Sequence, residues 1–162
     1  MSSDEPNDIK QLSLEQAATH LLEECRMVLP GIQALFGFQL VAVFSARFAD
    51  ALTLSEQLLH LVAIMCVVLA VALVMAPAVL HRRRQPEAVS RRFIELSSGL
   101  LMWSMAPLAA GTVLDVYLVS RIILGSMIAA GVIAAAASVV FVGLWVTLPA
   151  RAALESGSPA SQ

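Results

Sequence analysis

Residues 57–80 read QLLHLVAIMCVVLAVALVMAPAVL and contain no Asp, Glu, Lys or Arg. A helix rises about 1.5 Å per residue, so this stretch can cross the roughly 30 Å hydrocarbon core of a bilayer. Strands of a membrane barrel are shorter and alternate apolar with polar residues, whereas this stretch is apolar on every face. The stretch therefore predicts a transmembrane helix.

Three further apolar stretches flank it in the sequence. We expect spans at about residues 28–49, 57–80, 96–119 and 122–148, which form a single four-helix membrane domain over residues 13–150. The composition agrees, because 59% of the residues are hydrophobic and only 14% are charged, against about 25% charged in soluble domains. Residues 1–12, which are acidic, and residues 151–162 are predicted to be disordered tails. The predicted fold class is an all-α four-helix bundle in a membrane.

The positive charges predict the orientation of these spans. If there are four crossings, eight Lys and Arg residues lie on one side, and only Arg47 and Arg121 lie on the other. Positive residues favour the cytoplasmic side, so we expect both termini to be cytoplasmic. The eight are Lys10, Arg26, Arg82, Arg83, Arg84, Arg91, Arg92 and Arg151.

A short amphipathic helix is predicted over residues 13–26, before the first span. Its apolar residues recur at three- and four-residue spacing, and Ser13 with Gln16 has the form of a capping box. We expect this helix to lie along the cytoplasmic surface. Its acidic residues suit contact with the Arg-rich loop at 82–92, although the two segments could also be solvated independently.

Two amides stand out within the first span. Gln33 and Gln39 both fall in the hydrocarbon, with Gln39 near the midplane if the span covers residues 28–49. An unpaired amide there costs several kcal/mol, so each needs a partner. The partner is either another helix or the lining of a polar path. Because they fall on different faces of the helix, we expect them to make different contacts.

The third span carries a small, polar face. Ser97, Ser104 and Gly111 are spaced seven residues apart, and Asp115 follows one turn later, which directs this face to the bundle interior. Pro107 is expected to release the carbonyl of Trp103, which Ser104 or a neighbouring hydroxyl could satisfy.

Asp115 is an ionisable residue of the kind that often marks function within a membrane. We place it near the outer end of its span, where Arg47 and Arg121 are candidate partners. An ion pair there would close the outer ends of the helices, and a functional role is the alternative.

The fourth span is rich in Gly and Ala. Gly125 with Ala129 and Gly131 with Ala135 have the spacing that permits close helix contact, within the chain or between copies.

Residue types that carry catalysis or bind cofactors do not gather in this sequence. His60 and His81 lie on one span about 31 Å apart, so they cannot share a metal or haem. Cys25 and Cys66 form no C-x-x-C motif, and we expect no disulfide. No phosphate loop or nucleophile elbow appears. We therefore expect no enzyme activity, no catalytic or metal site, no cofactor and no nucleic-acid partner.

The run EECRMVLPGIQALFGFQ at residues 23–39 carries a resemblance. With the segments LVAVFSARFADAL, LLHLVAI, MAPAVLHR and PLAAGTVLDVYLV, it resembles a family of small bacterial four-span membrane proteins of unknown function. The resemblance covers roughly residues 20–125 and implies a bacterial cytoplasmic-membrane location. It implies no activity.

Two functions compete at this point. The sequence favours a structural or interaction module that assembles with itself or with a larger membrane partner, because no charged residue is predicted at the midplane. The alternative is a small homo-oligomeric transporter or channel for protons, cations or small solutes, which Gln33, Gln39 and Asp115 support.

Overall fold

The computed structural model describes residues 5–83 and 91–147, all of them in helices or short connections. Its long helices are α1 (Glu5–Val43), α3 (Leu54–Arg83), α4 (Arg91–Leu124) and α5 (Met127–Val142). A short helix, α2 (Ala46–Ala51), connects α1 to α3, and a π-helical turn, η1 (Gly143–Thr147), continues α5. The predicted all-helical architecture is confirmed.

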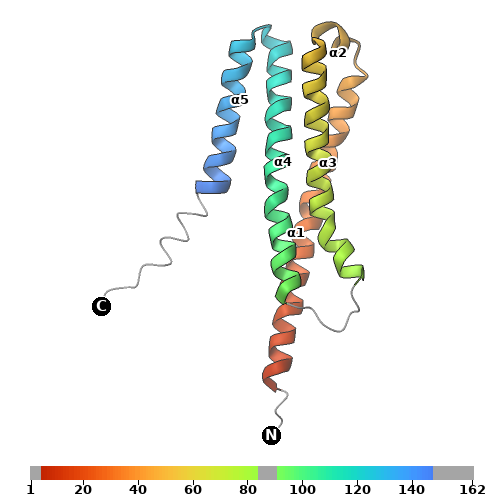
Figure 1. Ribbon diagram of the computed structural model, residues 1–162, viewed down its shortest axis with the longest axis vertical. Helices are drawn as coiled ribbons and strands as arrows, with labels where there is room; N and C mark the ends of the chain where they lie inside the picture. The colour runs from red at the N-terminus through yellow and green to blue at the C-terminus, as the bar shows by residue number, and fades with distance from the viewer. Residues whose placement is uncertain (1–4, 84–90, 148–162) are drawn as a thin grey trace, which may run out of the picture.

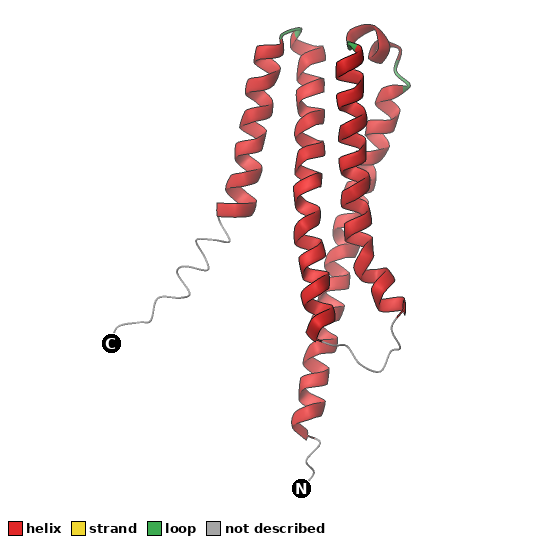
Figure 2. Ribbon diagram, in the orientation of Figure 1, coloured by secondary structure: helices red, strands yellow, loops and turns green. Residues whose placement is uncertain are grey.

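The four long helices run up and down in sequence order (Figure 1). α3 and α4 form the central pair, α1 packs against both of them, and α5 packs on α4 at the periphery. Loops are short wherever the described chain turns (Figure 2). This arrangement leaves α1 and α5 with long faces that no other helix covers.

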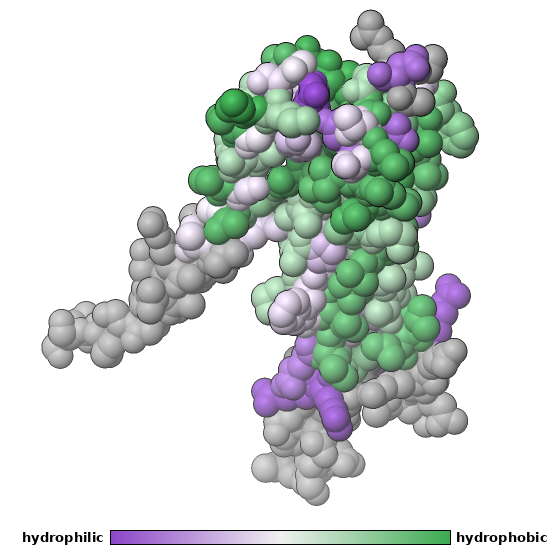
Figure 3. All heavy atoms as spheres, turned by 45° about the horizontal axis from the view of Figure 1, so that its top comes forward, coloured by the Kyte–Doolittle hydropathy of each residue, from purple (hydrophilic) through white to green (hydrophobic). Residues whose placement is uncertain are grey.

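All four long helices are long and apolar enough to cross a membrane. The qualifying segments are Leu14–Val43, Leu54–Leu80, Arg91–Leu124 and Met127–Trp145. Hydrophobic side chains cover much of the middle of the visible surface, and hydrophilic residues gather toward its ends (Figure 3). Residues with more than two thirds of their surface exposed include Met27, Phe38, Met102, Trp103, Ile123 and Ile128. Such a surface is what lipid contact requires, since hydrocarbon does not penalise exposed apolar side chains.

The α3–α4 interface is the tightest contact in the fold. Ser97, Ser104, Gly111 and Leu118 are all buried on α4, at the seven-residue spacing of a helix-packing seam. A side-chain carbon at Gly111 would stand 3.0 Å from the carbonyl oxygen of Ala63. Only glycine permits this approach, which confirms that the small face of the third span points into the bundle.

The N-terminal part of α1 corrects two predictions. No separate surface helix exists at residues 13–26, because that segment continues without a break into the first span. The helix already begins at Glu5, within the tail predicted to be disordered. The apolar face of the predicted amphipathic segment is buried within the protein, since Ala18, Leu21 and Cys25 are all buried. That face packs on the bundle, where Leu21 and Cys25 join Val67 and Val74 in the apolar core.

The proposed partner of this segment falls mostly outside the described residues, because residues 84–90 of the Arg-rich loop are not among them. The flanking Arg82, Arg91 and Arg92 are exposed, as are Glu23 and Glu24. The predicted C-terminal tail at 151–162 also lies outside the described residues.

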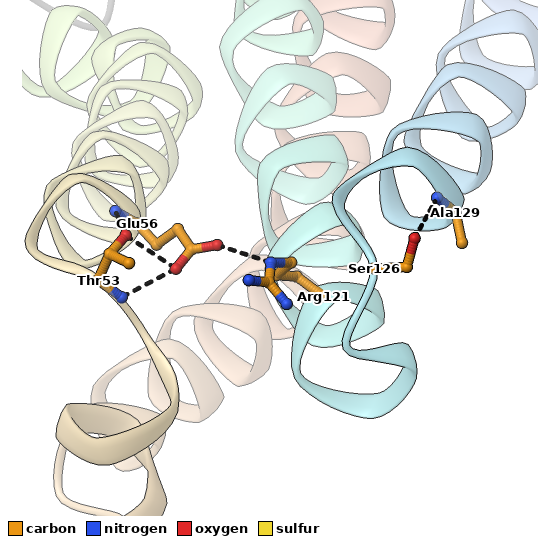
Figure 4. Close-up of polar contacts among 5 residues, drawn as sticks. All are labelled: Thr53, Glu56, Arg121, Ser126 and Ala129. Carbon is orange, nitrogen blue, oxygen red and sulfur yellow. Dashed lines mark hydrogen bonds and ion pairs between the residues drawn. The ribbon is translucent and has the colours of Figure 1, made fainter.

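The turn between α4 and α5 corrects the start of the fourth span. The helix predicted at 122–148 is interrupted at Gly125, whose φ of 65° lies in the left-handed region that glycine adopts without strain. The Gly125 amide bonds the carbonyl of Arg121 and so ends α4. Ser126 then caps α5 by accepting a hydrogen bond from the amide of Ala129 (Figure 4). Gly125 therefore belongs to the turn and not to a small-residue contact along α5.

Candidate functional site

Three polar side chains from three helices meet in the interior of the bundle. Gln39 of α1 donates a hydrogen bond from Nε2 to Oδ2 of Asp115 on α4, over 2.6 Å. His60 of α3 lies 3.0 Å from the backbone carbonyl oxygen of Gln39 through its Nε2. Its Nδ1 lies 3.5 Å from Oδ1 of Asp115. We call Gln39, His60 and Asp115 the three-helix cluster.

The cluster is shielded from the surroundings. Gln39 is 3% exposed, and the side chains of His60 and Asp115 are 7% and 16% exposed. The ring of Phe48 from α2 stands edge-on to the His60 imidazole, with centroids 5.1 Å apart. A carboxylate and an imidazole are therefore held in an apolar setting, where unpaired charge is strongly disfavoured.

The contacts of His60 indicate which of its two ring nitrogens carries a hydrogen. A carbonyl oxygen only accepts, so Nε2 of His60 carries a hydrogen and donates it to Gln39. Nδ1 then faces a carboxylate oxygen, and two bare lone pairs would repel each other. The contact is favourable when one proton lies between them, as imidazolium facing carboxylate or as imidazole facing carboxylic acid. Both forms leave the pair neutral, so the cluster can hold one dissociable proton without burying net charge.

A cavity of about 230 Å³ borders the cluster. Gln39, His60 and Asp115 lie in its wall, and the rest of the lining is apolar, including Phe38 and Leu118. Because Phe38 is 75% exposed, this side of the cavity faces the surroundings of α1. The cavity therefore places an apolar space directly beside the buried cluster.

A second polar contact lies nearer the end of the bundle. Thr53 and Glu56 cap α3, because the amide and hydroxyl of Thr53 donate to Oε2 of Glu56 over 2.8 and 2.9 Å. Oε1 of Glu56 lies 3.0 Å from Nε of Arg121 on α4 (Figure 4). We call Glu56 and Arg121 the end pair. Glu56 lies in the first turn of α3 and Arg121 in the last turn of α4. Each charge is opposite in sign to the partial charge at its helix end, so both interact favourably with the helix dipoles.

The two contacts revise the predicted partners of Asp115. It pairs with Gln39 and His60, while Arg121 pairs with Glu56. The expected pairing of Asp115 with Arg121 is not found, because Arg121 lies against Glu56 at the start of the facing helix. Arg47 lies in α2, and the structure does not describe its side chain. Asp115 precedes the end of α4 by nine residues, roughly 14 Å of helix, while its partner Gln39 precedes the end of α1 by four residues.

Of the other polar residues predicted within the spans, Gln39 and Ser104 are buried in the bundle and Gln33 is exposed. Gln39 is inside but lies one turn before the end of α1, not at its middle, because α1 ends at Val43 instead of Ala49. Gln33 is exposed on the outer face of the same helix. Ser104 is buried, and its hydroxyl donates to the carbonyl of Leu101 over 2.6 Å, not to that of Trp103.

His60 and Glu56 are the residues that sequence reasoning missed. His60 was considered only as a metal ligand, and its proton chemistry with a distant carboxylate was not considered. Glu56 carried a usable signal, since the run Thr53–Leu–Ser–Glu56 is a capping box before an apolar helix. Nothing local to His60 reveals its partners, because Gln39 and Asp115 are 21 and 55 residues away in sequence.

These features define a class: an all-helical protein with four helices able to span a membrane and a polar cluster buried among three of them. Within that class, the chain belongs to the family of unknown function DUF6328, whose model matches residues 8–149. Neither a curated protein nor a solved structure matches the chain. The family is one of unknown function, so the assignment brings no activity with it.

Proposed function

We propose that this protein is a small membrane transporter in which the three-helix cluster binds the coupling proton. The observation that carries the proposal is the meeting of Asp115 and His60 in a buried, apolar setting, at N···O 3.5 Å. Ionisable residues at such positions are costly and are characteristic of proton and ion pathways. The sequence alone favoured an interaction module because no deep carboxylate was apparent. Asp115 lies nine residues before the end of α4 and contacts Gln39 and His60, which supports the transporter proposal.

The proposed chemistry uses the single proton held between His60 and Asp115. Its loss would leave one uncompensated negative charge, which a cation or a protonated solute entering the neighbouring cavity could balance. Proton release and solute binding would then be linked by electrostatics, without a catalytic step. Gln39 would orient the carboxylate through its hydrogen bond to Oδ2. In this proposal the protein is not an enzyme and needs no cofactor.

The decisive experiment is a flux assay with purified protein in liposomes under an imposed pH gradient. Protons, monovalent cations and a cationic dye would be followed in turn. We expect Asp115→Asn to abolish flux because it removes the dissociable proton. Asp50→Asn is the matched control, since it makes the same chemical change at an exposed position on α2 and should retain flux. Equal flux in both variants, or none above protein-free liposomes for the unaltered chain, contradicts the proposal.

We also propose that the protein lies in the bacterial cytoplasmic membrane with both termini in the cytoplasm. The support is the excess of Lys and Arg at one end of the four helices, and the pairing of Arg121 with Glu56 at the other. Reporter fusions after Gln85 and Gln162 should behave as cytoplasmic, and a fusion after Thr53 as external. A cytoplasmic Thr53 reporter would overturn this topology.

A second candidate function is an interaction module for a larger membrane protein. It is favoured by a cavity of about 860 Å³ that lies between α4, the part of α1 around Leu21, and the end of α5 with η1. Its lining is mainly apolar and includes Met102, Met105, Phe141 and Trp145, side chains that suit a partner helix. Photo-crosslinkers at Met102 should capture one defined membrane protein in cells, whereas the same probe at Ile128 of α5 should not.

A further inference from the structure

The outer face of α1 contains one polar side chain without a partner. We define this face by Pro30, Gln33, Ala34, Gly37 and Val41, which recur at three- and four-residue spacing along the helix. Pro30, Gln33, Ala34 and Val41 are exposed, and Gly37 is half-buried. Within residues 5–83 and 91–147, nothing hydrogen-bonds the Gln33 amide.

Gln33 also lies deep within the apolar part of α1. The nearest charged residues in sequence are Arg26 and Arg47, and the helix ends at Val43. At about 1.5 Å per residue, Gln33 is roughly 10 Å from Arg26 and roughly 15 Å from Val43 along the axis. Water and lipid headgroups are therefore out of reach of this amide in a bilayer, and hydrocarbon tails offer it no hydrogen bond.

The residues around Gln33 leave room for another helix backbone. A side-chain carbon added at Gly37 would find nothing within 4 Å, and the same is true at Gly31. Pro30 and Ala34 add little bulk on either side of the amide. Small residues at such positions allow two membrane helices to approach closely, so that van der Waals contact and hydrogen bonds between them become strong.

We propose that the outer face of α1 is the interface of a homodimer, in which Gln33 of each copy hydrogen-bonds Gln33 of the other. An amide carries both donors and acceptors, so it is complementary to itself. A two-fold axis beside Gln33 places the two amides opposite each other and pairs both at once. No second type of protein and no lipid headgroup is needed to satisfy the group. The inference does not depend on transport, because Gln33 is exposed and Asp115 meets α1 at the buried Gln39 instead.

Disulfide crosslinking tests this interface with the full chain in liposomes. Ala34→Cys is introduced with Cys25 and Cys66 changed to Ala, because both native thiols are free. We expect copper phenanthroline to convert this variant to a covalent dimer. Ile128→Cys in the same background is the matched control, since Ile128 is 82% exposed on α5, away from the proposed interface. Equal crosslinking at the two positions overturns the proposal.

The role of the amide is tested separately by measuring dimer dissociation with fluorescent labels as the lipid-to-protein ratio rises. Gln33→Leu should raise the dissociation constant about three- to thirtyfold, the range expected for interhelical hydrogen bonds. Gln33→Asn should recover part of the loss. Gly37→Leu keeps the amide but fills the contact, and it should also weaken the dimer while the monomer stays folded. An unchanged dissociation constant in Gln33→Leu, or a monomer at every ratio, contradicts the homodimer whatever the flux assay gives.

Discussion

The two glutamines of α1 are six residues apart and lie in opposite environments. Gln39 is 3% exposed and hydrogen-bonds Asp115, whereas Gln33 is exposed and has no partner within the described chain. On the inner face of α1, the side-chain nitrogen of Gln39 therefore finds its partner within the same chain. On the outer face, the Gln33 amide has no hydrogen-bond partner within residues 5–83 and 91–147, and in hydrocarbon such an amide is costly without one.

This difference shows that a polar residue in a span carries two separate signals. Its type indicates that a hydrogen bond must be made, and its face determines whether that bond is internal or external. Inner positions should respond to mutation through folding, since their partners are in the same chain. Outer positions should respond through association, and the following predictions test that division.

The largest loss of stability is expected at the inner packing seam, for Gly111→Val. The new side chain would meet the Ala63 carbonyl and Val67, both within 3.0 Å of the position of its first carbon. We expect the free energy of unfolding to fall by about 3 kcal/mol, the upper range for overpacking. Thermal unfolding in detergent, followed by circular dichroism, measures the change. Gly99→Val on the same helix is the control, because nothing lies within 4 Å of a side-chain carbon there.

A smaller loss is expected from Asp115→Leu. This change removes the acceptor of Gln39 and the proton partner of His60, and it leaves two buried polar groups unsatisfied. The expected cost is about 2 kcal/mol in the free energy of unfolding. Asp115→Asn should cost less, because an amide oxygen can still accept from Gln39. If the two variants were equally stable, the hydrogen bonds of the cluster would contribute nothing measurable.

Gln39→Leu should lower the free energy of unfolding by about 1 kcal/mol. It removes one interhelical hydrogen bond, and such bonds contribute roughly 0.6–2 kcal/mol in membrane proteins. The backbone carbonyl that His60 contacts stays in place, so that contact survives. Combining Gln39→Leu with Asp115→Leu should cost less than the sum of the two single changes, because both remove the same bond. If the losses in free energy of unfolding were strictly additive, the Gln39–Asp115 hydrogen bond would make no measurable contribution to stability.

The smallest effect on folding is expected for Gln33→Leu. Replacing an exposed amide with an apolar side chain removes no internal bond, so the monomer should unfold within about 0.5 kcal/mol of the unaltered chain. Its effect should appear only in dimer dissociation. A large drop in monomer stability would place Gln33 among the inner residues and remove the contrast with Gln39.

Much of the fold could be read from the sequence because it depends on local properties. The backbone N–H and C=O groups of residues 57–80 must find partners within the segment if it lies in hydrocarbon. Only a helix pairs them all within one such segment. The seven-residue spacing of Ser97, Ser104 and Gly111 likewise predicted which face of α4 is buried. The extent of α1 was misjudged, because helix propensity alone does not reveal whether an amphipathic segment bends onto a surface or continues into the bundle.

The sequence itself determined the four helices able to span a membrane and the small face of α4, through hydrophobicity and periodicity. The three-helix cluster was decided only by the tertiary structure. Gln39, His60 and Asp115 are far apart along the chain, and their meeting depends on how α1, α3 and α4 align in height and rotation. The same alignment pairs Arg121 with Glu56 and leaves Gln33 exposed on the outer face of α1. Hydropathy records how strongly a residue avoids lipid, but the direction in which it finds a partner is fixed only when the helices pack.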